Sequence, residues 1–197
     1  MELMNILTLI ISLLVAVGFI GVIFRMFEKS KPSVEYIVML AVLIAIAVVA
    51  NFIGSILHID LVFFIVIMAG VVFGKESGFL SIIVFGLISG AGIGTWTPYQ
   101  MIGFGLLGYT SGLFANKMES LPFRAVFGLL WGFIYGWITN ISWFYFVPIS
   151  VPSIISTYTA SIFYDASRGI CTLILLVIAY TWFKEIFQRN KEKYQLE

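Results

Sequence analysis

The sequence predicts an all-α integral membrane protein with seven spans, its N-terminus outside and its C-terminus inside. The first observation behind this prediction is composition: 61% of the 197 residues are hydrophobic, 11% are charged, and the mean hydropathy is +1.07. A soluble domain carries about 25% charged residues, and a fold of this length cannot bury so much apolar surface. The second is the recurrence of apolar runs, and the third is the placement of the basic residues. Together they exclude a soluble enzyme, a disordered chain and a disulfide scaffold.

The apolar runs give seven segments, most of them near the roughly 20 residues that a helix needs to cross a bilayer. The third is the exception: it is short and must either be flanked by polar residues that reach the interface or lie where the protein is thin. Before the first segment, Glu2 is the only charged residue, so a membrane helix is favoured there over a cleaved signal peptide. In order, the segments are about 3–24, 36–57, 61–74, 78–95, 98–115, 123–147 and 153–184.

Small residues recur at every fourth position in several of these segments, which lets helix backbones approach closely in lipid. We expect the glycine stripes to serve packing inside the protein. The alanine stripe in 36–57 consists of Ala41 and Ala45. The glycine stripes are Gly86, Gly90 and Gly94 in 78–95, Gly108 and Gly112 in 98–115, and Gly128, Gly132 and Gly136 in 123–147.

The orientation follows from the lysines and arginines, ten of which fall in alternate connections. By the positive-inside rule, these connections are cytoplasmic. The N-terminus and the second, fourth and sixth connections carry no basic residue, so they are predicted to lie outside. The ten residues are Arg25, Lys29 and Lys31, then Lys75, then Lys117 and Arg124, then Lys184, Arg189, Lys191 and Lys193 in the tail.

The eleventh basic residue, Arg168, lies inside the last segment. It precedes Lys184 by 16 positions, about 24 Å along a helix, which places it in the outer third of the membrane. Asp165 stands three positions earlier and can face the same way. Charged side chains at that depth face the protein interior or a polar cavity. The pair is therefore either an ion pair that joins helices or part of a ligand cavity.

Aromatic and polar side chains gather in the predicted outer connections. Trp96 and Gln100 lie around the fourth connection, and Asn140, Trp143 and Tyr158 around the sixth. Some of these rings fit an aromatic belt at the membrane surface, and the same groups could hold a ligand. Asn51 lies at moderate depth in the membrane on segment 36–57, and its amide could hydrogen-bond a ligand or another helix. His58 and Asp60, in the short second connection, are either ordinary turn residues or contacts at the rim of a site.

No catalytic motif, metal site or cofactor site is predicted. The chain has one histidine and one cysteine, Cys171, and it lacks a nucleophile with a base, a metalloprotease motif and a phosphate-binding loop. The spelling GFGLLG at 103–108 lies in an apolar span with no strand before it, so it does not predict a dinucleotide site. The formal net charge of +1 predicts no nucleic-acid partner.

Three runs resemble a known family of membrane proteins: LVFFIVIMAGVVFG at 61–74, KESGF at 75–79 and GTWTPYQMIGFGLLG at 94–108. They are similar to the S components of energy-coupling factor (ECF) transporters, which are the substrate-binding membrane subunits of these vitamin importers. With the size, the polarity and the alanine pair, the resemblance covers about residues 36–187. The runs point to the family and leave the substrate open.

The resemblance implies a six-helix core over 36–187 that captures a vitamin or related micronutrient at its outer face. Residues 1–35 would then be an extra N-terminal transmembrane helix with a cytoplasmic linker, a departure from the family, and 188–197 a charged cytoplasmic tail. The core would dock, through Ala41 and Ala45, on a transmembrane coupling subunit that carries two ATPase subunits. The chain itself would be a multi-pass plasma-membrane protein without enzymatic activity, cofactor or metal.

The expected ligand contacts divide by chemistry. Arg168 would meet an anionic or carbonyl group and be held by Asp165, or the two roles could be reversed. Rings would wall the ligand and amides would hydrogen-bond it. A stand-alone oligomeric carrier of a small organic solute is the alternative function. The expected rings are Trp96, Trp143 and Tyr158, and the expected amides are Asn51, Gln100 and Asn140.

Overall fold

The computed structural model describes residues 2–29, 31, 33–57, 60–75 and 94–193. This part of the chain is α-helical and contains no strand. Two short 3-10 helices, η1 and η2, flank α6. The helices are α1 (Glu2–Lys29), α2 (Val34–Leu57), α3 (Val62–Phe73), α5 (Thr97–Leu113), η1 (Lys117–Glu119), α6 (Leu121–Asn140), η2 (Ile141–Tyr145), α7 (Val151–Ile178) and α8 (Tyr180–Lys193).

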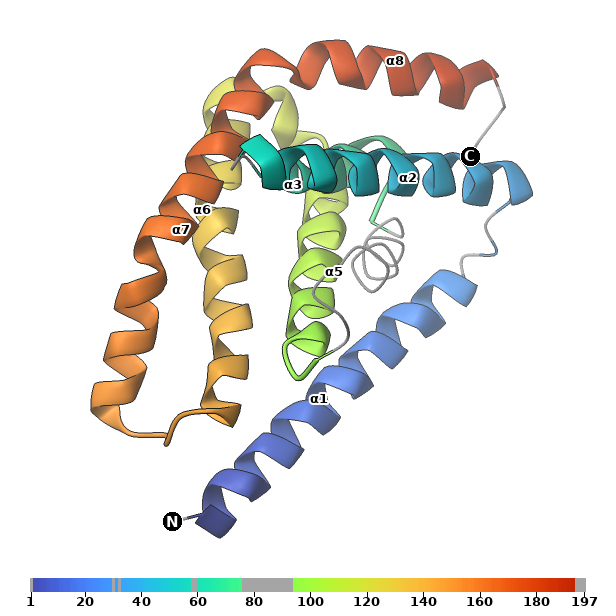
Figure 1. Cartoon of the computed structure of the whole chain (residues 1–197). Helices are drawn as coiled ribbons and strands as arrows, with labels where there is room; N and C mark the ends of the chain where they lie inside the picture. The colour runs from blue at the N-terminus through green and yellow to red at the C-terminus, as the bar shows by residue number, and fades with distance from the viewer. Residues whose placement is uncertain (1, 30, 32, 58–59, 76–93, 194–197) are drawn as a thin grey trace.

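The helices form two groups that run in different directions (Figure 1). Helices α5, α6 and α7 stand side by side, and α6 packs along α7 over most of its length. Helices α2, α3 and α8 run across them, with α3 packed against both α2 and α8. Helix α1 lies obliquely beside α5 and contacts it.

Three of the described helical segments are long and apolar enough to cross a membrane: Val34–Gly54, Leu121–Tyr145 and Val151–Ile178. The predicted all-α class and the apolar character suited to a membrane are therefore confirmed. The predicted span 78–95 lies outside the described residues except for its last two positions. The count of seven spans and their orientation stay predictions.

Helix α3 is the centre of the fold. Eleven of its 12 residues are buried, and it contacts α2, α5, α7 and α8. It approaches α5 closely at Gly70, where an added Cβ would lie 2.7 Å from Ser111 Oγ. Twelve residues extend about 18 Å, well short of the hydrocarbon thickness. The third predicted segment is short and uniformly apolar because other helices surround it.

The glycine stripe of α6 forms the contact with α7. An added Cβ on Gly132 would lie 2.5 Å from Gly169 Cα, and one on Gly128 would lie 2.7 Å from Leu176 Cδ1. On Gly136, it would overlap the carboxylate of Asp165. The predicted use of this stripe for internal packing is confirmed. Because small residues let two membrane helices approach closely, the stripe also lets a charged side chain of α7 lie flat against α6.

The last predicted segment, 153–184, is not one straight helix. Helix α7 ends at Ile178, and α8 begins at Tyr180 and turns across the top of the view in Figure 1. The turn brings two rings of α8 onto α3. Phe183 packs edge-to-face on Phe64 with 5.0 Å between the ring centroids, and Phe187 packs on Phe73 with 6.3 Å between the centroids. The sequence alone predicts a continuing apolar helix because these rings are apolar. Their partners on α3 decide the direction.

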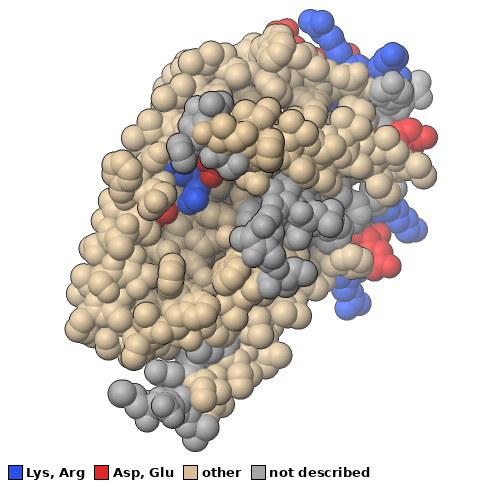
Figure 2. Space-filling model, in the orientation of Figure 1, with Lys and Arg blue, Asp and Glu red and all other residues tan. Residues whose placement is uncertain are grey.

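The basic connections adjoin one another along α8. Near its start, α8 contacts η1 through the ion pair of Lys184 with Glu119. Its last turn reaches the end of α3, where Lys191 Nζ lies 3.5 Å from Val72 O. The start of α2 joins the same end of α3, since Tyr36 donates a 2.8 Å hydrogen bond to Phe73 O. Figure 2 shows charged side chains along this edge of an otherwise largely uncharged face. A common membrane side for these connections requires such an arrangement.

Glu119 makes the junction of η1 with α8 sensitive to acid. The hydrogen bond from Lys184 holds the pKa of the Glu119 carboxyl below its ordinary value of 4.5, and Tyr180 donates a second hydrogen bond at 3.1 Å. A lowered pKa means that the pair stabilises the folded state above the ordinary pKa and that this stability is lost as the pH falls through the lowered value. The side chain is 54% exposed, so solvent weakens the effect.

We therefore expect Glu119→Gln to be less stable than the natural protein at neutral pH by about 0.5 kcal/mol. The difference should disappear in acid, where the carboxyl of the natural protein is protonated. Thermal unfolding of both proteins in detergent, from neutral pH down to about pH 3, measures it. A difference that persists unchanged into acid would contradict the role of the Glu119 charge.

Candidate functional site

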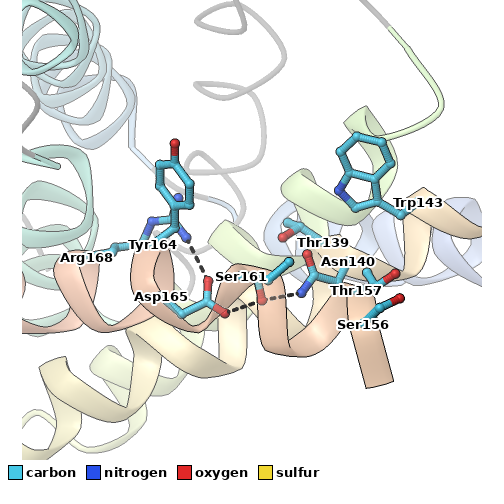
Figure 3. A pocket seen from close by; sticks show the side chains of 10 residues that line it. Thr139, Asn140, Trp143, Ser156, Thr157, Ser161, Tyr164, Asp165 and Arg168 are labelled. Atoms are coloured by element: carbon cyan, nitrogen blue, oxygen red, sulfur yellow. Dashed lines mark hydrogen bonds and ion pairs between the residues drawn. The ribbon is translucent and has the colours of Figure 1, made fainter. Parts of the chain in front are cut away.

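Two adjoining cavities lie where α6 ends and α7 begins. The first, of about 560 Å³, lies between the end of α6, η2 and one face of α7; the second, of about 510 Å³, lies between the start of α5, the end of α6 and η2. They share three lining residues: Thr139, Asn140 and Trp143. Figure 3 shows the first cavity, with polar side chains of α7 facing the end of α6. The two volumes together can hold a small organic molecule.

Helix α7 supplies most of the polar wall. It starts with a capping box, in which Ser150 Oγ accepts from Ser153 N at 3.3 Å and Ser153 Oγ accepts from Ser150 N at 3.0 Å. From this fixed start, side chains three or four positions apart fall on one face of the helix. The residues of that face that line the cavity are Thr157, Ser161, Asp165 and Arg168, joined by Ser156, Ala160 and Tyr164 beside them.

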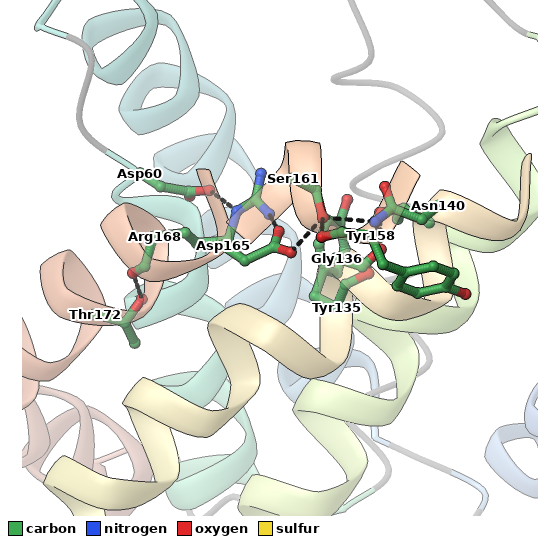
Figure 4. A network of polar contacts seen from close by, with 10 residues as sticks. Asp60, Tyr135, Gly136, Asn140, Tyr158, Ser161, Asp165, Arg168 and Thr172 are labelled. Atoms are coloured by element: carbon green, nitrogen blue, oxygen red, sulfur yellow. Dashed lines mark hydrogen bonds and ion pairs between the residues drawn. The ribbon is translucent and has the colours of Figure 1, made fainter. Parts of the chain in front are cut away.

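Three charged side chains meet beside the first cavity, which two of them, Asp165 and Arg168, line (Figure 4). Arg168 Nε donates a 2.8 Å hydrogen bond to Asp60 Oδ2, and Arg168 Nη1 lies 3.6 Å from Asp165 Oδ1. The guanidinium also lies over the rings of Tyr135, at 4.9 Å, and Phe63, at 5.4 Å. We call Asp60, Asp165 and Arg168 the charged triad; α3, α6 and α7 together hold it in place.

A chain of hydrogen bonds connects the charged triad to the shared wall of the two cavities. Asn140 Nδ2 donates to Ser161 Oγ at 2.7 Å, and Ser161 Oγ donates to Asp165 Oδ2 at 2.9 Å. Asp165 is only 2% exposed, and its carboxylate fits because Gly136 has no side chain. The end of α6 and the middle of α7 therefore act as one polar unit.

Six of the eight predicted site residues come together. Asn140, Trp143, Asp165 and Arg168 line the first cavity, and Trp96 and Gln100 line the second. The predicted closeness of Asp165 to Arg168 is confirmed. The other two predicted residues lie elsewhere: Asn51 is half-buried in α2, and Tyr158 donates a 3.2 Å hydrogen bond to Trp137 O. Neither lines either of these two cavities.

Sequence reasoning misses two important members of the site. For Asp60 it allows a turn residue or a rim contact, yet this carboxylate is the hydrogen-bond partner of Arg168. It does not single out Ser161, which connects Asn140 with Asp165. The spacing of four between Ser161 and Asp165 is a usable signal. The contact of Asp60, 108 positions away from Arg168, has no local signal.

One residue that lines the second cavity, Gln100, has an unsatisfied polar atom. Gln100 Oε1 is buried and has no hydrogen-bond partner within the described residues. A buried acceptor without a donor costs free energy, and a ligand that donates to it removes that cost. In the part of the chain that the structure covers, no cluster of three or more His, Cys, Asp or Glu side chains could hold a metal ion. The side chains that line the two cavities are mainly hydrogen-bonding and aromatic.

Comparison of the chain with protein-family models, with curated proteins and with solved structures gives no match. The assignment of the site therefore rests on the geometry described above.

Proposed function

We propose that the chain is the substrate-binding membrane subunit of an ATP-driven importer of the ECF type. In this proposal it is a multi-pass plasma-membrane protein that binds a vitamin or related micronutrient from outside. It passes the ligand on through a transmembrane coupling subunit carrying two ATPases. The observation that carries the proposal is the pair of adjoining cavities with a polar wall, two tryptophans and the charged triad.

The cavities support binding because they combine the two features of small-molecule sites, apolar walls and a few fixed polar groups. Trp96 and Trp143 provide aromatic surface, and the hydrogen-bond chain from Asn140 to Asp165 fixes the polar groups before a ligand arrives. Groups that are already ordered lose little entropy on binding.

The exposed face of α2 supports the proposed docking on a partner helix. Ala41 and Ala45 are both exposed on α2, so their small side chains leave a shallow strip on that helix. Exposed Val42 and Val49 belong to the same helix. A partner helix can approach such a strip closely, which is how small residues promote association in lipid.

Filling the first cavity should abolish ligand binding. Ala160 lines the cavity, and Ala160→Trp would occupy it with an indole ring. Ile162→Trp is the matched control because Ile162 lies on the same helix, is 52% exposed and lines neither cavity. Mass spectrometry of small molecules released from the purified full chain should find a bound solute in the natural protein and in the control, and at least about tenfold less in Ala160→Trp.

Equal amounts of solute in all three proteins, or none in any, would contradict the binding role. Co-purification from the native membrane tests the rest of the proposal: a coupling membrane subunit and two ATPases should accompany the chain. Accumulation of the released solute by vesicles that contain this chain alone would instead identify a stand-alone carrier.

A further inference from the structure

The charged triad is unbalanced. Asp60 and Asp165 each carry a negative charge and Arg168 carries one positive charge, so the sum is −1 when both carboxyls are ionised. Asp60 makes the closer contact with Arg168, at 2.8 Å against 3.6 Å for Asp165. The surplus negative charge therefore falls on Asp165. Its side chain lines the first cavity.

Arg168 is poorly placed to attract an anion. Two carboxylates neutralise its guanidinium, and the rings of Tyr135 and Phe63 lie against it. An anionic ligand would change the net charge of the site from −1 to −2, in surroundings where water screens charges weakly. A cationic ligand would bring the charge to zero. The geometry thus favours the reversed roles, with the charge of Asp165 attracting the ligand and Arg168 holding Asp165.

The lining of the second cavity also favours a cationic ligand. Gln100 lines this cavity, and its buried, unpartnered Oε1 accepts an N–H or O–H donor once the side chain turns toward the cavity. The cavity is bordered by Trp96 and Trp143, and the faces of indole rings attract cations and stack on flat rings. Trp143 belongs to both cavities, so one ligand can extend from the rings of the second cavity into the first, where Asp165 lies.

We propose that the two cavities bind one small organic cation, a flat ring that carries N–H donors. The positive group lies toward Asp165, and the ring lies between Trp143 and Trp96. This inference deepens the proposed function and rests on it, because it names the class of molecule that the same site binds.

Three probes of nearly the same shape test the charge preference: 4-fluorobenzamidinium, 4-fluorobenzamide and 4-fluorobenzoate are a cation, a neutral molecule and an anion. Fluorine NMR titration of the purified full chain in detergent measures their binding. We expect the amidinium to bind at least about tenfold more tightly than the benzoate. In Asp165→Asn, whose triad is neutral, this ratio should fall close to one.

Gln100→Met provides a second variant, in case Asp165→Asn does not fold. Methionine has a similar volume and removes the unpartnered oxygen, so the variant should fold, and amidinium binding should weaken about threefold for the lost hydrogen bond. Gln188→Met is the matched control, because Gln188 is exposed on α8 and lines neither cavity. This variant should leave amidinium binding unchanged.

Equal binding of the three probes, tighter binding of the benzoate, or no binding of any probe would overturn the cation assignment. These outcomes differ from failure of the proposed function, which the solute content of Ala160→Trp decides without any probe. A benzoate preference together with solute loss in Ala160→Trp would leave a binding subunit whose ligand is an anion.

Discussion

Replacing Gly136 with alanine should lower the free energy of unfolding by about 3 kcal/mol, the upper end of the usual cost of overpacking. The new methyl group would occupy the space of the Asp165 carboxylate, so either α6 must move away from α7 or Asp165 must leave its position. Either change lowers the free energy of unfolding. Moving the helix opens the contact at Gly132, and moving the carboxylate breaks its hydrogen bond with Ser161.

Gly21→Ala is the matched control. Gly21 lies in α1, also within a helix, and an added Cβ there would meet nothing within 4 Å. Alanine favours helix over glycine by up to about 1 kcal/mol, so this change should leave stability unchanged or raise it. Thermal unfolding in detergent compares the two variants. If Gly136→Ala behaves like Gly21→Ala, α6 and α7 are not in close contact at Asp165.

Replacing Arg168 with methionine should cost about 2 to 3 kcal/mol of unfolding free energy. The change leaves Asp60 and Asp165 without their shared cation, and an unpaired charge in poorly hydrated surroundings is expensive. The partial exposure of Arg168, 24% of its side chain, keeps the cost below that of a fully buried pair.

A double variant separates the ion pair from the loss of packing. Asp60→Asn with Arg168→Met removes one of the stranded charges, so it should recover part of the stability that Arg168→Met loses. The control is Arg189→Met: Arg189 is 78% exposed and pairs loosely with Glu185 at 3.5 Å, so its loss should cost at most about 0.5 kcal/mol. Chemical denaturation in detergent measures the natural protein and these three variants. Equal losses in Arg168→Met and Arg189→Met would show that the triad is not held by charge.

The parts of the fold that follow from local sequence are predictable. Apolar runs locate the helices, and the spacing of Gly128, Gly132 and Gly136 marks a packing face because one helix alone determines it. The direction in which a helix leaves its neighbour is different. The break at Ala179 depends on rings of α8 reaching rings of α3, and no pattern within 153–184 contains that information.

The candidate site divides in the same way. Asp165 and Arg168 lie three positions apart on one helix, so their closeness follows from helical spacing. The prediction of Trp96 and Trp143 rests on their chemistry and their place in the connections predicted to lie outside, and the fold brings both to one cavity. The contact of Asp60 with Arg168 joins residues 108 positions apart and arises only when α3 packs against α7.

The near-complete enclosure of α3 changes what its residues must do. Among the described helices it is the most apolar, yet helices touch it where lipid would touch a spanning segment. The shape of a side chain, more than its hydrophobicity, then decides whether α3 tolerates it. Phe63 and Ile67 are both 0% exposed, and an apolar residue of different shape would not fill the spaces that they occupy. Its sequence should therefore tolerate exchange of apolar residues less freely than the exposed, oily surfaces of α1 and α2.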